Sequence, residues 1–373
     1  MKSGALVDAT DAGAATGAIS GKLAEPIAKP RLDWIDGLRG MAAVAVMIYH
    51  FHEYLIRSLG MSSSTLYSAS VPFFDLGKFA VVLFFLISGF VAPFSLRAKV
   101  QPLKAFLVSR FFRLYPAYWL ALGLAGLLGV ADVSGWAYIV NFSMLHKFLG
   151  IRDAVGVFWT LQIELIFYGL CVALFVRGAL WNARTVFLVA VAALSAALLM
   201  AWARYQMELK LPVALFLALF SMMLGLQCRL WFDGVAKASV YVVGLCVVFL
   251  VALPAICLLA YSRNYGFNES WSRYLISYLS AYAVFALFAI GRPVCWKSVR
   301  YLGTISYSIY LLHQVVGYAF ANAIRSADES WSVWPLIVAS SVFVGLVSSF
   351  SYFLIERPMN SLGRRFVRAL QAA

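Results

Sequence analysis

The feature that most constrains this chain is a series of apolar stretches, each long enough to cross a lipid bilayer as a helix. A spanning helix needs about 20 predominantly apolar residues, and stretches of this length follow one another along most of the sequence. They are residues 34–56, 76–96, 111–130, 157–177, 183–203, 212–231, 238–260, 271–290, 300–325 and 334–356. Because 63% of the residues are hydrophobic and only 12% are charged, an ordinary soluble domain is excluded. We expect an all-α, polytopic integral membrane protein with about ten transmembrane helices.

The domain organisation follows from this pattern. Residues 1–30 are rich in Ala and Gly and lack an apolar core of signal-peptide length, so we expect a disordered N-terminal tail. Residues 31–360 form the expected transmembrane domain, and residues 361–373 form a basic C-terminal tail. Residues 136–149 are apolar but too short to span, and they include polar side chains, which indicates a re-entrant or interfacial segment.

The basic residues predict the orientation of the helices. An even number of helices places both termini on one side, and most of the 30 lysines and arginines fall in the termini and loops of that side. Cytoplasmic loops are enriched in these residues, so we expect both termini to be cytoplasmic. The net charge of +14 is then mainly a consequence of topology. Nucleic-acid binding would require the charge on one solvated domain, and we therefore expect no nucleic-acid partner.

The cysteines indicate neither disulfides nor a metal site. All five lie within or beside the expected spans, without paired spacing. We expect them to be small packing residues, and we expect no metal.

Two ionisable residues, Arg39 and His50, lie in the first expected span. In a helix, the two side chains point in directions that differ by only about 20°, and they are separated by about 16 Å along the helix axis. Ionisable side chains inside a membrane are costly and usually functional. This arrangement suits one long ligand that is contacted at both ends.

A carboxylate and a histidine are expected at similar depth below the outer surface. His50 lies about 9 Å of rise from the outer end of its span, and Glu164 lies about 10 Å from the outer end of the fourth span. Because a buried carboxylate and an imidazole are natural partners, we expect Glu164 to orient the His50 ring. His52 points elsewhere and is expected to be interfacial, whereas Glu53 either supports His50 or extends to the membrane surface.

A second group of charges lies at the expected cytoplasmic ends of the helices. Arg110 and Arg113 are three positions apart and share one helix face, so their guanidinium groups can converge near Arg39. Guanidinium forks suit phosphate oxygens, which predicts a site for a phosphate-bearing ligand. Glu356 ends the last expected span, where we expect it to pair with a basic loop.

These motifs, taken together, resemble the acyltransferase 3 family of polytopic membrane O-acyltransferases. The resemblance covers about residues 32–360, with the motifs in the family's order. The matching segments are Arg39 and His50 after Asp36-Gly-Leu, Phe84-Phe-Leu-Ile-Ser88-Gly89-Phe90, Arg110-x-x-Arg113-x-x-Pro116, Phe158-Trp159-Thr-Leu-Gln-Ile-Glu164-Leu-Ile-Phe-Tyr168, Ser306-Tyr-Ser-Ile-Tyr310-Leu-Leu-His313 and Glu356-Arg-Pro358.

The resemblance implies a ten-helix domain in a bacterial inner membrane that transfers an acyl group from cytoplasmic acyl-CoA to a hydroxyl, usually on a sugar. It implies that His50 is the catalytic histidine and that three arginines bind the donor, namely Arg39, Arg110 and Arg113. Acyl-CoA is then a substrate, and no tightly bound cofactor is expected. Thr160 and Gln162 depart from the Trp-Ser-Leu-x-x-Glu pattern of many members. Some members carry a C-terminal hydrolase-like domain, and we expect a stand-alone form here.

The chemistry can also be argued from the residues. Transfer from a thioester to an alcohol needs a base for the hydroxyl and stabilisation of the developing oxyanion. We expect His50 to act as general base and Glu164 to stabilise the imidazolium. Direct transfer is our hypothesis, and an acyl-enzyme on His50 or a nearby serine is the alternative. We expect a lumen between the first, third, fourth and ninth spans. Four further side chains are expected to bind substrate there: Trp159, Tyr168, Tyr310 and His313. For His313, a role in a structural hydrogen-bond network is the alternative.

Other functional classes remain open at this point. A transporter or flippase for an anionic or lipid-linked substrate would also place polar residues at mid-depth, although no internal repeat or paired broken helix is visible. A sensor or scaffold that binds acyl-CoA without turnover is a third class. For the enzyme, the sequence allows an acetyl or a succinyl-like group and any glycan or glycoconjugate acceptor on the periplasmic side. The expected partners are acyl-CoA, the acceptor and membrane lipid, and the oligomeric state is not predicted.

Overall fold

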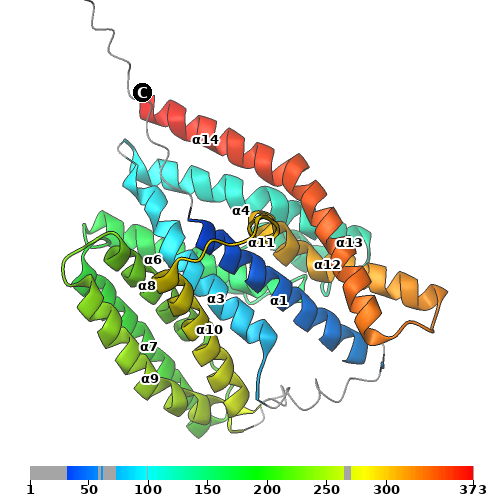
Figure 1. Ribbon diagram of the computed structural model, residues 1–373, viewed down its shortest axis with the longest axis horizontal. Coiled ribbons are helices and arrows are strands. Elements are labelled where there is room, and N and C mark those ends of the chain that lie inside the picture. The colour runs from blue at the N-terminus through cyan, green and yellow to red at the C-terminus, as the bar shows by residue number, and fades with distance from the viewer. Residues whose placement is uncertain (1–31, 58–59, 62–72, 99, 264–269, 373) are drawn as a thin grey trace, which may run out of the picture. The chain divides into compact units, whose positions relative to one another are not determined.

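The computed structural model describes residues 32–57, 60–61, 73–98, 100–263 and 270–372, and every regular element in these ranges is helical. The expected tail at residues 1–30 lies outside them. Figure 1 shows the long helices packed side by side. Those that coincide with the ten expected spans are α1 (Asp33–Arg57), α3 (Leu76–Val91), α4 (Pro102–Leu127), α6 (Trp159–Val176), α7 (Ala183–Met207), α8 (Val213–Phe232), α9 (Ala238–Tyr261), α10 (Trp271–Gly291), α12 (Ser306–Ala327) and α13 (Val333–Ser351).

Shorter elements connect or extend these helices. They are η1 (Ala92–Arg97), α5 (Gly135–Asn141), η2 (His146–Leu149), η3 (Gly156–Phe158), α11 (Lys297–Thr304), the π-helical turn η4 (Tyr352–Glu356) and α14 (Arg357–Ala372). The apolar stretch at 136–149 therefore forms two short helices and not a span.

Seven helical segments in the described part of the chain are long and apolar enough to cross a membrane. The helices at the other three expected spans, α1, α4 and α12, are 25, 26 and 22 residues long, but they carry more polar and ionisable residues. The all-α class is thus confirmed, and the protein is a multi-pass membrane protein. The three polar helices supply most of the residues that the sequence singled out, because such side chains must face protein and not lipid.

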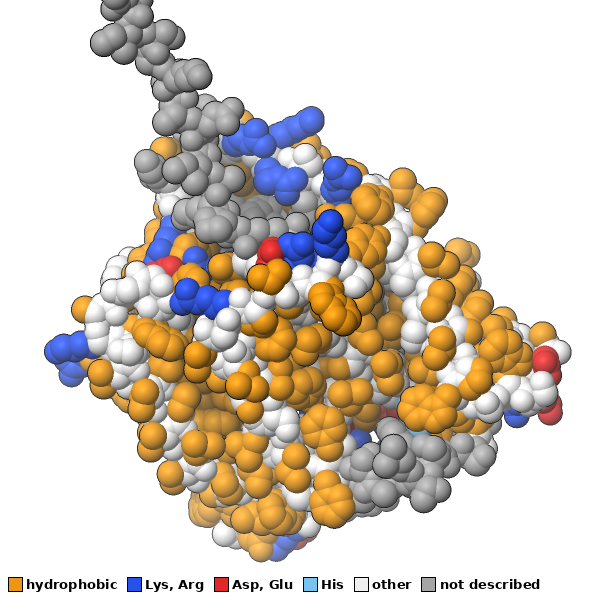
Figure 2. All heavy atoms as spheres, in the orientation of Figure 1, with side chains coloured by type: hydrophobic (Ala, Val, Ile, Leu, Met, Phe, Trp, Pro, Cys, Tyr) orange, Lys and Arg blue, Asp and Glu red, His pale blue; other side chains and the backbone are white. Residues whose placement is uncertain are grey.

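The surface shows where lipid would contact the protein. Large apolar side chains are exposed along α7, α9, α10 and α13, as expected for helices that face hydrocarbon. In Figure 2, hydrophobic side chains cover much of the visible face, and Lys and Arg gather at the edge where α14 lies in Figure 1. By contrast, α1 packs against α3, α10, α11, α12 and α13. Helix α1 therefore occupies the interior.

The end of the chain is helical. Residues 361–372, expected as a basic tail, form the later part of α14, which packs against α4. The Phe366 ring stacks on Phe112 at a centroid separation of 5.6 Å, and Gly363 lies directly against the same ring. Arg364, Arg365 and Arg368 are exposed.

Helices α3 and α8 approach each other closely at two glycines. A Cβ atom at Gly89 would lie 1.8 Å from the Met222 carbonyl oxygen, and one at Gly225 would lie 2.1 Å from the Leu86 carbonyl oxygen. Both obstacles are backbone atoms, so a side chain at either position would force the helices apart. Small residues at such crossings allow close packing in membranes, and Gly89 and Gly225 have this role here.

We predict that Gly89→Ala destabilises the protein by about 1–3 kcal/mol, because the added methyl group overpacks a backbone contact. The measurement is the thermal midpoint of the purified protein in detergent. Gly169→Ala in α6 is the matched control, since no atom lies within 4 Å of the added Cβ. Equal midpoints for the two variants would contradict the close α3–α8 contact.

The segment between η2 and η3 is held by a polar network that links it to the start of α6. His146 is fully buried, and its Nε2 lies 2.9 Å from Asp153 Oδ1 and 2.6 Å from Gln162 Nε2 of α6. Lys147 Nζ lies 2.7 Å from the other Asp153 oxygen. Burial by itself would raise the pKa of Asp153, but its contacts with His146 and Lys147 outweigh that effect and lower the pKa. The charged carboxylate is therefore the form that holds this segment.

Because the pKa of Asp153 is lowered on folding, its contribution to stability is present above the unfolded value of about 4 and is lost as the pH falls through the folded value. We predict faster hydrogen exchange of peptides covering residues 142–158 in Asp153→Asn than in the wild type at pH 7. Acidification below the unfolded value should progressively reduce this difference. Exposed Asp132→Asn is the control, and unchanged exchange in Asp153→Asn would show that the network is dispensable.

Candidate functional site

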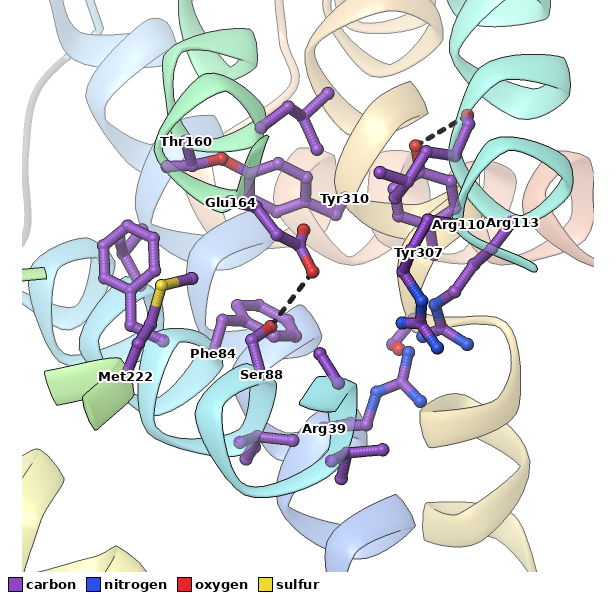
Figure 3. Close-up of a pocket in the computed structure, with 18 residues that line it drawn as sticks. Arg39, Phe84, Ser88, Arg110, Arg113, Thr160, Glu164, Met222, Tyr307 and Tyr310 are labelled. Atoms are coloured by element: carbon purple, nitrogen blue, oxygen red, sulfur yellow. Dashed lines mark hydrogen bonds between the residues drawn. The ribbon is translucent and has the colours of Figure 1, made fainter. Parts of the chain in front are cut away.

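Three arginines from two helices converge at one pocket. Arg39 of α1 and Arg110 and Arg113 of α4 line it together with residues of α3, α6, α8 and α12. Figure 3 shows the guanidinium groups of Arg110 and Arg113 side by side, with that of Arg39 pointing toward them. The pocket has an empty volume of about 860 Å³, its open mouth included. The expected convergence of the arginines is confirmed. The pocket is lined by the four helices expected to surround a lumen, α1, α4, α6 and α12, and also by α3 and α8.

The arginines are only partly neutralised by the protein. Neither Arg39 nor Arg113 makes a hydrogen bond or an ion pair with the residues that the structure describes. Arg110 donates a hydrogen bond to Ser95 Oγ at 2.8 Å and lies over the rings of Phe106 and Tyr168. Like charges repel at such close range, so three adjacent guanidinium groups favour the binding of an anion.

Glu164 lines the same pocket on the α6 side. Its Oε1 accepts a hydrogen bond from Ser88 Oγ at 3.3 Å and a short one from the Tyr168 hydroxyl. It also interacts electrostatically with Arg39. In Figure 3, the Glu164 carboxylate lies between the hydroxyl groups of Thr160 and Tyr310 and the arginines. The carboxylate is thus part of the arginine pocket.

The expected pairing of Glu164 with His50 is wrong. The Val157 amide, two residues before α6, donates to Gln314 Oε1 at 3.3 Å, next to His313 in α12. Helix α6 therefore begins at the level of the histidines, and Glu164 lies about 10 Å of rise further along it, towards Arg110. The depth predicted from the sequence took the outer ends of the first and fourth spans as level with each other. In the structure, the start of α6 lies beside α12, and Phe158 and Leu161 are buried there inside the protein.

His50 has other partners. Its Nδ1 lies 3.9 Å from Glu53 Oε2, and the His50 side chain is 22% exposed. Glu53 is also paired with Arg57 at 3.2 Å. Of the two roles considered for Glu53, support of His50 is the one that the geometry favours. The ring of His313 lies against the His50 ring, with 5.3 Å between centroids.

His313 is fully buried and held in one orientation. Its Nδ1 lies 2.8 Å from the Tyr310 carbonyl oxygen and 3.1 Å from that of Ile309. This contact assigns the proton to Nδ1 and leaves Nε2 as an acceptor. Nε2 has no hydrogen-bond partner among the described residues. The ring is thus fixed with this acceptor atom buried inside the protein.

Tyr310 connects the arginine pocket to the histidines. Its hydroxyl lies 2.6 Å from Thr160 Oγ1 and donates to the Val157 carbonyl at 2.7 Å. Its ring lines the pocket and lies 6.0 Å from the His313 ring. A continuous row of side chains therefore runs from the pocket to His50.

The remaining expected residues lie near the site with different roles. Trp159 does not line the pocket, and it packs edge-to-face on Phe85, which does, at 6.3 Å. Tyr168 contacts the site through Glu164. His52, expected at the interface, is 1% exposed and lies against Trp334, because its helix face points into α13.

Sequence reasoning missed some pocket residues and misplaced Glu356. Ser88, Ser306 and Tyr307 line the pocket, and the sequence predicted none of them as a substrate-binding residue. The spacing of Ser306 and Tyr310 at four residues does indicate a common helix face. Glu356, expected at the surface, is 5% exposed and accepts a hydrogen bond from Ser308 at 2.9 Å. The π-helical turn η4 ends at this residue and carries its side chain inward.

Comparison with known proteins supports the family indicated by these residues. The chain matches the family model described as an acyltransferase domain over residues 32–352, a range that includes the three pocket arginines and both His50 and His313. It is similar to Nodulation protein 10 of Rhizobium leguminosarum bv. viciae, with 26% identity over 368 aligned positions, 88% of this chain and 93% of that protein. No solved structure matches it. The match over most of the chain shows that this protein belongs to the acyltransferase 3 family.

Proposed function

We propose that this protein is an acyl-CoA-dependent O-acyltransferase of a bacterial inner membrane. It moves an acyl group, acetyl or succinyl-like, from cytoplasmic acyl-CoA to a hydroxyl of a glycan or glycoconjugate on the periplasmic side. The observation that carries the proposal is the convergence of three incompletely paired guanidinium groups in a pocket whose far side leads, through Tyr310 and His313, to His50.

The arginine pocket suits the nucleotide end of the donor. The phosphates of CoA would bind Arg39, Arg110 and Arg113 through charge-assisted hydrogen bonds. The pantetheine arm would then extend towards His50, about 16 Å of rise further along α1 from Arg39. Glu164 lies between these ends and can accept hydrogen bonds from the amide groups of that arm.

The chemistry would take place at the histidines. His50 accepts the proton of the acceptor hydroxyl while the hydroxyl oxygen forms a bond to the thioester carbonyl carbon. The carbon–sulfur bond breaks, and the proton passes from His50 to the departing thiolate. Glu53, with its carboxylate 3.9 Å from His50 Nδ1, stabilises the imidazolium in place of Glu164. His313 Nε2 accepts a hydrogen bond from the acceptor and orients it.

We predict that His50→Ala lowers acyl transfer by 100-fold or more, within the range of about 10²–10⁴ for general bases. Glu53→Gln should lower it by a smaller factor. The measurement is transfer of radiolabel from acetyl- and succinyl-CoA into a glycan fraction by membranes with equal amounts of each protein. CoA binding should be unchanged in His50→Ala. Normal transfer by this variant would exclude His50 as base, whereas wild-type protein that moves an anionic solute without transfer would favour a transporter.

We predict that Arg113→Gln weakens CoA binding by about tenfold or more, because it removes a charge-assisted hydrogen bond worth about 1.5–3 kcal/mol. Calorimetric titration of the purified protein with CoA is the measurement, and the affinity should fall with salt. The matched control is Arg365→Gln, which removes an exposed arginine of α14. Equal affinities for the two variants would place the phosphates elsewhere.

A further inference from the structure

A second pocket lies between the two loops that precede α7 and α9, helices that pack side by side (Figure 1). It is lined by residues 181–184 and 235–237 and by Tyr241, and its empty volume is about 570 Å³ with the open mouth included. This volume lies within the usual range of ligand pockets. The pocket shares no lining residue with the arginine pocket, and the function proposed above gives it no role.

Two cations at this pocket, Arg184 and Lys237, are not neutralised by the protein. Both are exposed, and neither side chain forms a hydrogen bond or an ion pair within the part of the chain that the structure describes. The acidic residue of the two loops, Asp233, is already engaged at 3.1 Å by Arg97 and at 3.1 Å by Arg229. The pocket therefore carries a net positive charge, which favours an anionic ligand.

Two aromatic residues of the pocket are held in place from behind. The Trp181 ring lies 6.2 Å from that of Phe94, between centroids, and the Arg97 guanidinium lies over it at 4.4 Å. The Tyr241 ring packs on Phe187 at 5.1 Å. The pocket is thus formed in the absence of a ligand. Trp and Tyr are also the residues enriched where a membrane meets water.

The second pocket lies on the same side of the helices as the arginines. Turn η1 connects the two regions, because its Ser95 accepts a hydrogen bond from Arg110 and its Arg97 lies over Trp181. In the orientation expected from the basic residues, this side is cytoplasmic. The cytoplasmic leaflet carries anionic lipids, and basic pockets between helices on that side bind their headgroups.

Each of the two cations is followed by exposed apolar side chains on the same helix face. Leu188, one turn after Arg184 in α7, is 54% exposed, and Val240, three residues after Lys237 at the start of α9, is 67% exposed. By helical periodicity, the same faces continue with three further exposed residues: Leu199, Val247 and Val251. A free phosphate would leave these side chains uncovered, whereas acyl chains attached to a phosphate would cover them.

We propose that the pocket between the starts of α7 and α9 binds the headgroup of an anionic phospholipid. Arg184 and Lys237 contact the phosphate, and the acyl chains lie along the exposed apolar faces of α7 and α9. The pocket by itself would suit any phosphate, and the apolar faces select a phosphate that carries acyl chains. This inference requires the expected orientation of the helices but no acyl transfer.

The first test is calorimetric titration of purified full-length protein in dodecyl maltoside with dioctanoyl phosphatidylglycerol. The double variant Arg184→Gln/Lys237→Gln should bind this lipid about tenfold or more weakly than the wild type, because both headgroup cations are removed. Arg365→Gln/Arg368→Gln is the matched control, since it removes two exposed arginines of α14, and its affinity should equal that of the wild type. No binding by the wild type, or an equal loss in both double variants, would overturn the inference.

The second test separates a lipid site from a site for free phosphate. Dioctanoyl phosphatidylcholine, which has no net charge, should bind the wild type about tenfold more weakly than phosphatidylglycerol does. Val240→Ser, which replaces an exposed apolar side chain, should weaken the binding of phosphatidylglycerol and not that of inorganic phosphate. Inorganic phosphate that binds as tightly as phosphatidylglycerol would show a free-phosphate site, and equal affinities for the two lipids would show that the cations do not recognise the headgroup. Either result would contradict the proposal.

Discussion

The need to keep charged side chains away from lipid governs how this protein is built. Arg39, Arg110 and Arg113 lie on helices long enough to cross a membrane, and each must face protein or a ligand. Helix α1 therefore lies in the interior, in contact with α3, α10, α11, α12 and α13. The more apolar α7, α9 and α13 expose large hydrophobic side chains. The same constraint that orders the helices also concentrates the ionisable groups in one pocket.

Polar groups in and beside this pocket are arranged in levels. The three guanidinium groups occupy one level, with Glu164 beside them. Thr160 and Tyr310 form the next level through a 2.6 Å contact between their hydroxyl groups. His313 and His50 follow, with their rings 5.3 Å apart. In the proposed function, acyl-CoA would contact the first level with its anionic end and the last level with its reactive end.

In the proposed function, the placement of two carboxylates separates donor binding from chemistry. Glu164 is held by Ser88 and Tyr168 within the arginine pocket, and Glu53 lies beside His50. Each carboxylate thus serves a different part of the proposed reaction. Glu356 is a third acidic residue. It is buried at the end of the π-helical turn η4 and accepts a hydrogen bond from the hydroxyl of Ser308.

The sequence by itself determined the all-α membrane class, the positions of the long helices and the shared face of Arg110 and Arg113, because apolar length and helical periodicity are local properties. The motif order indicated the family, and with it the importance of Arg39 and His50. Only the tertiary structure decided that Glu164 lies with the arginines, that Glu53 accompanies His50, and that Glu356 points inward. These facts depend on where α6 begins relative to α12 and on how η4 turns. The start of α6 and the direction of η4 are both set by packing between helices that are distant in the sequence. Residue spacing along a single helix carries no information about such packing.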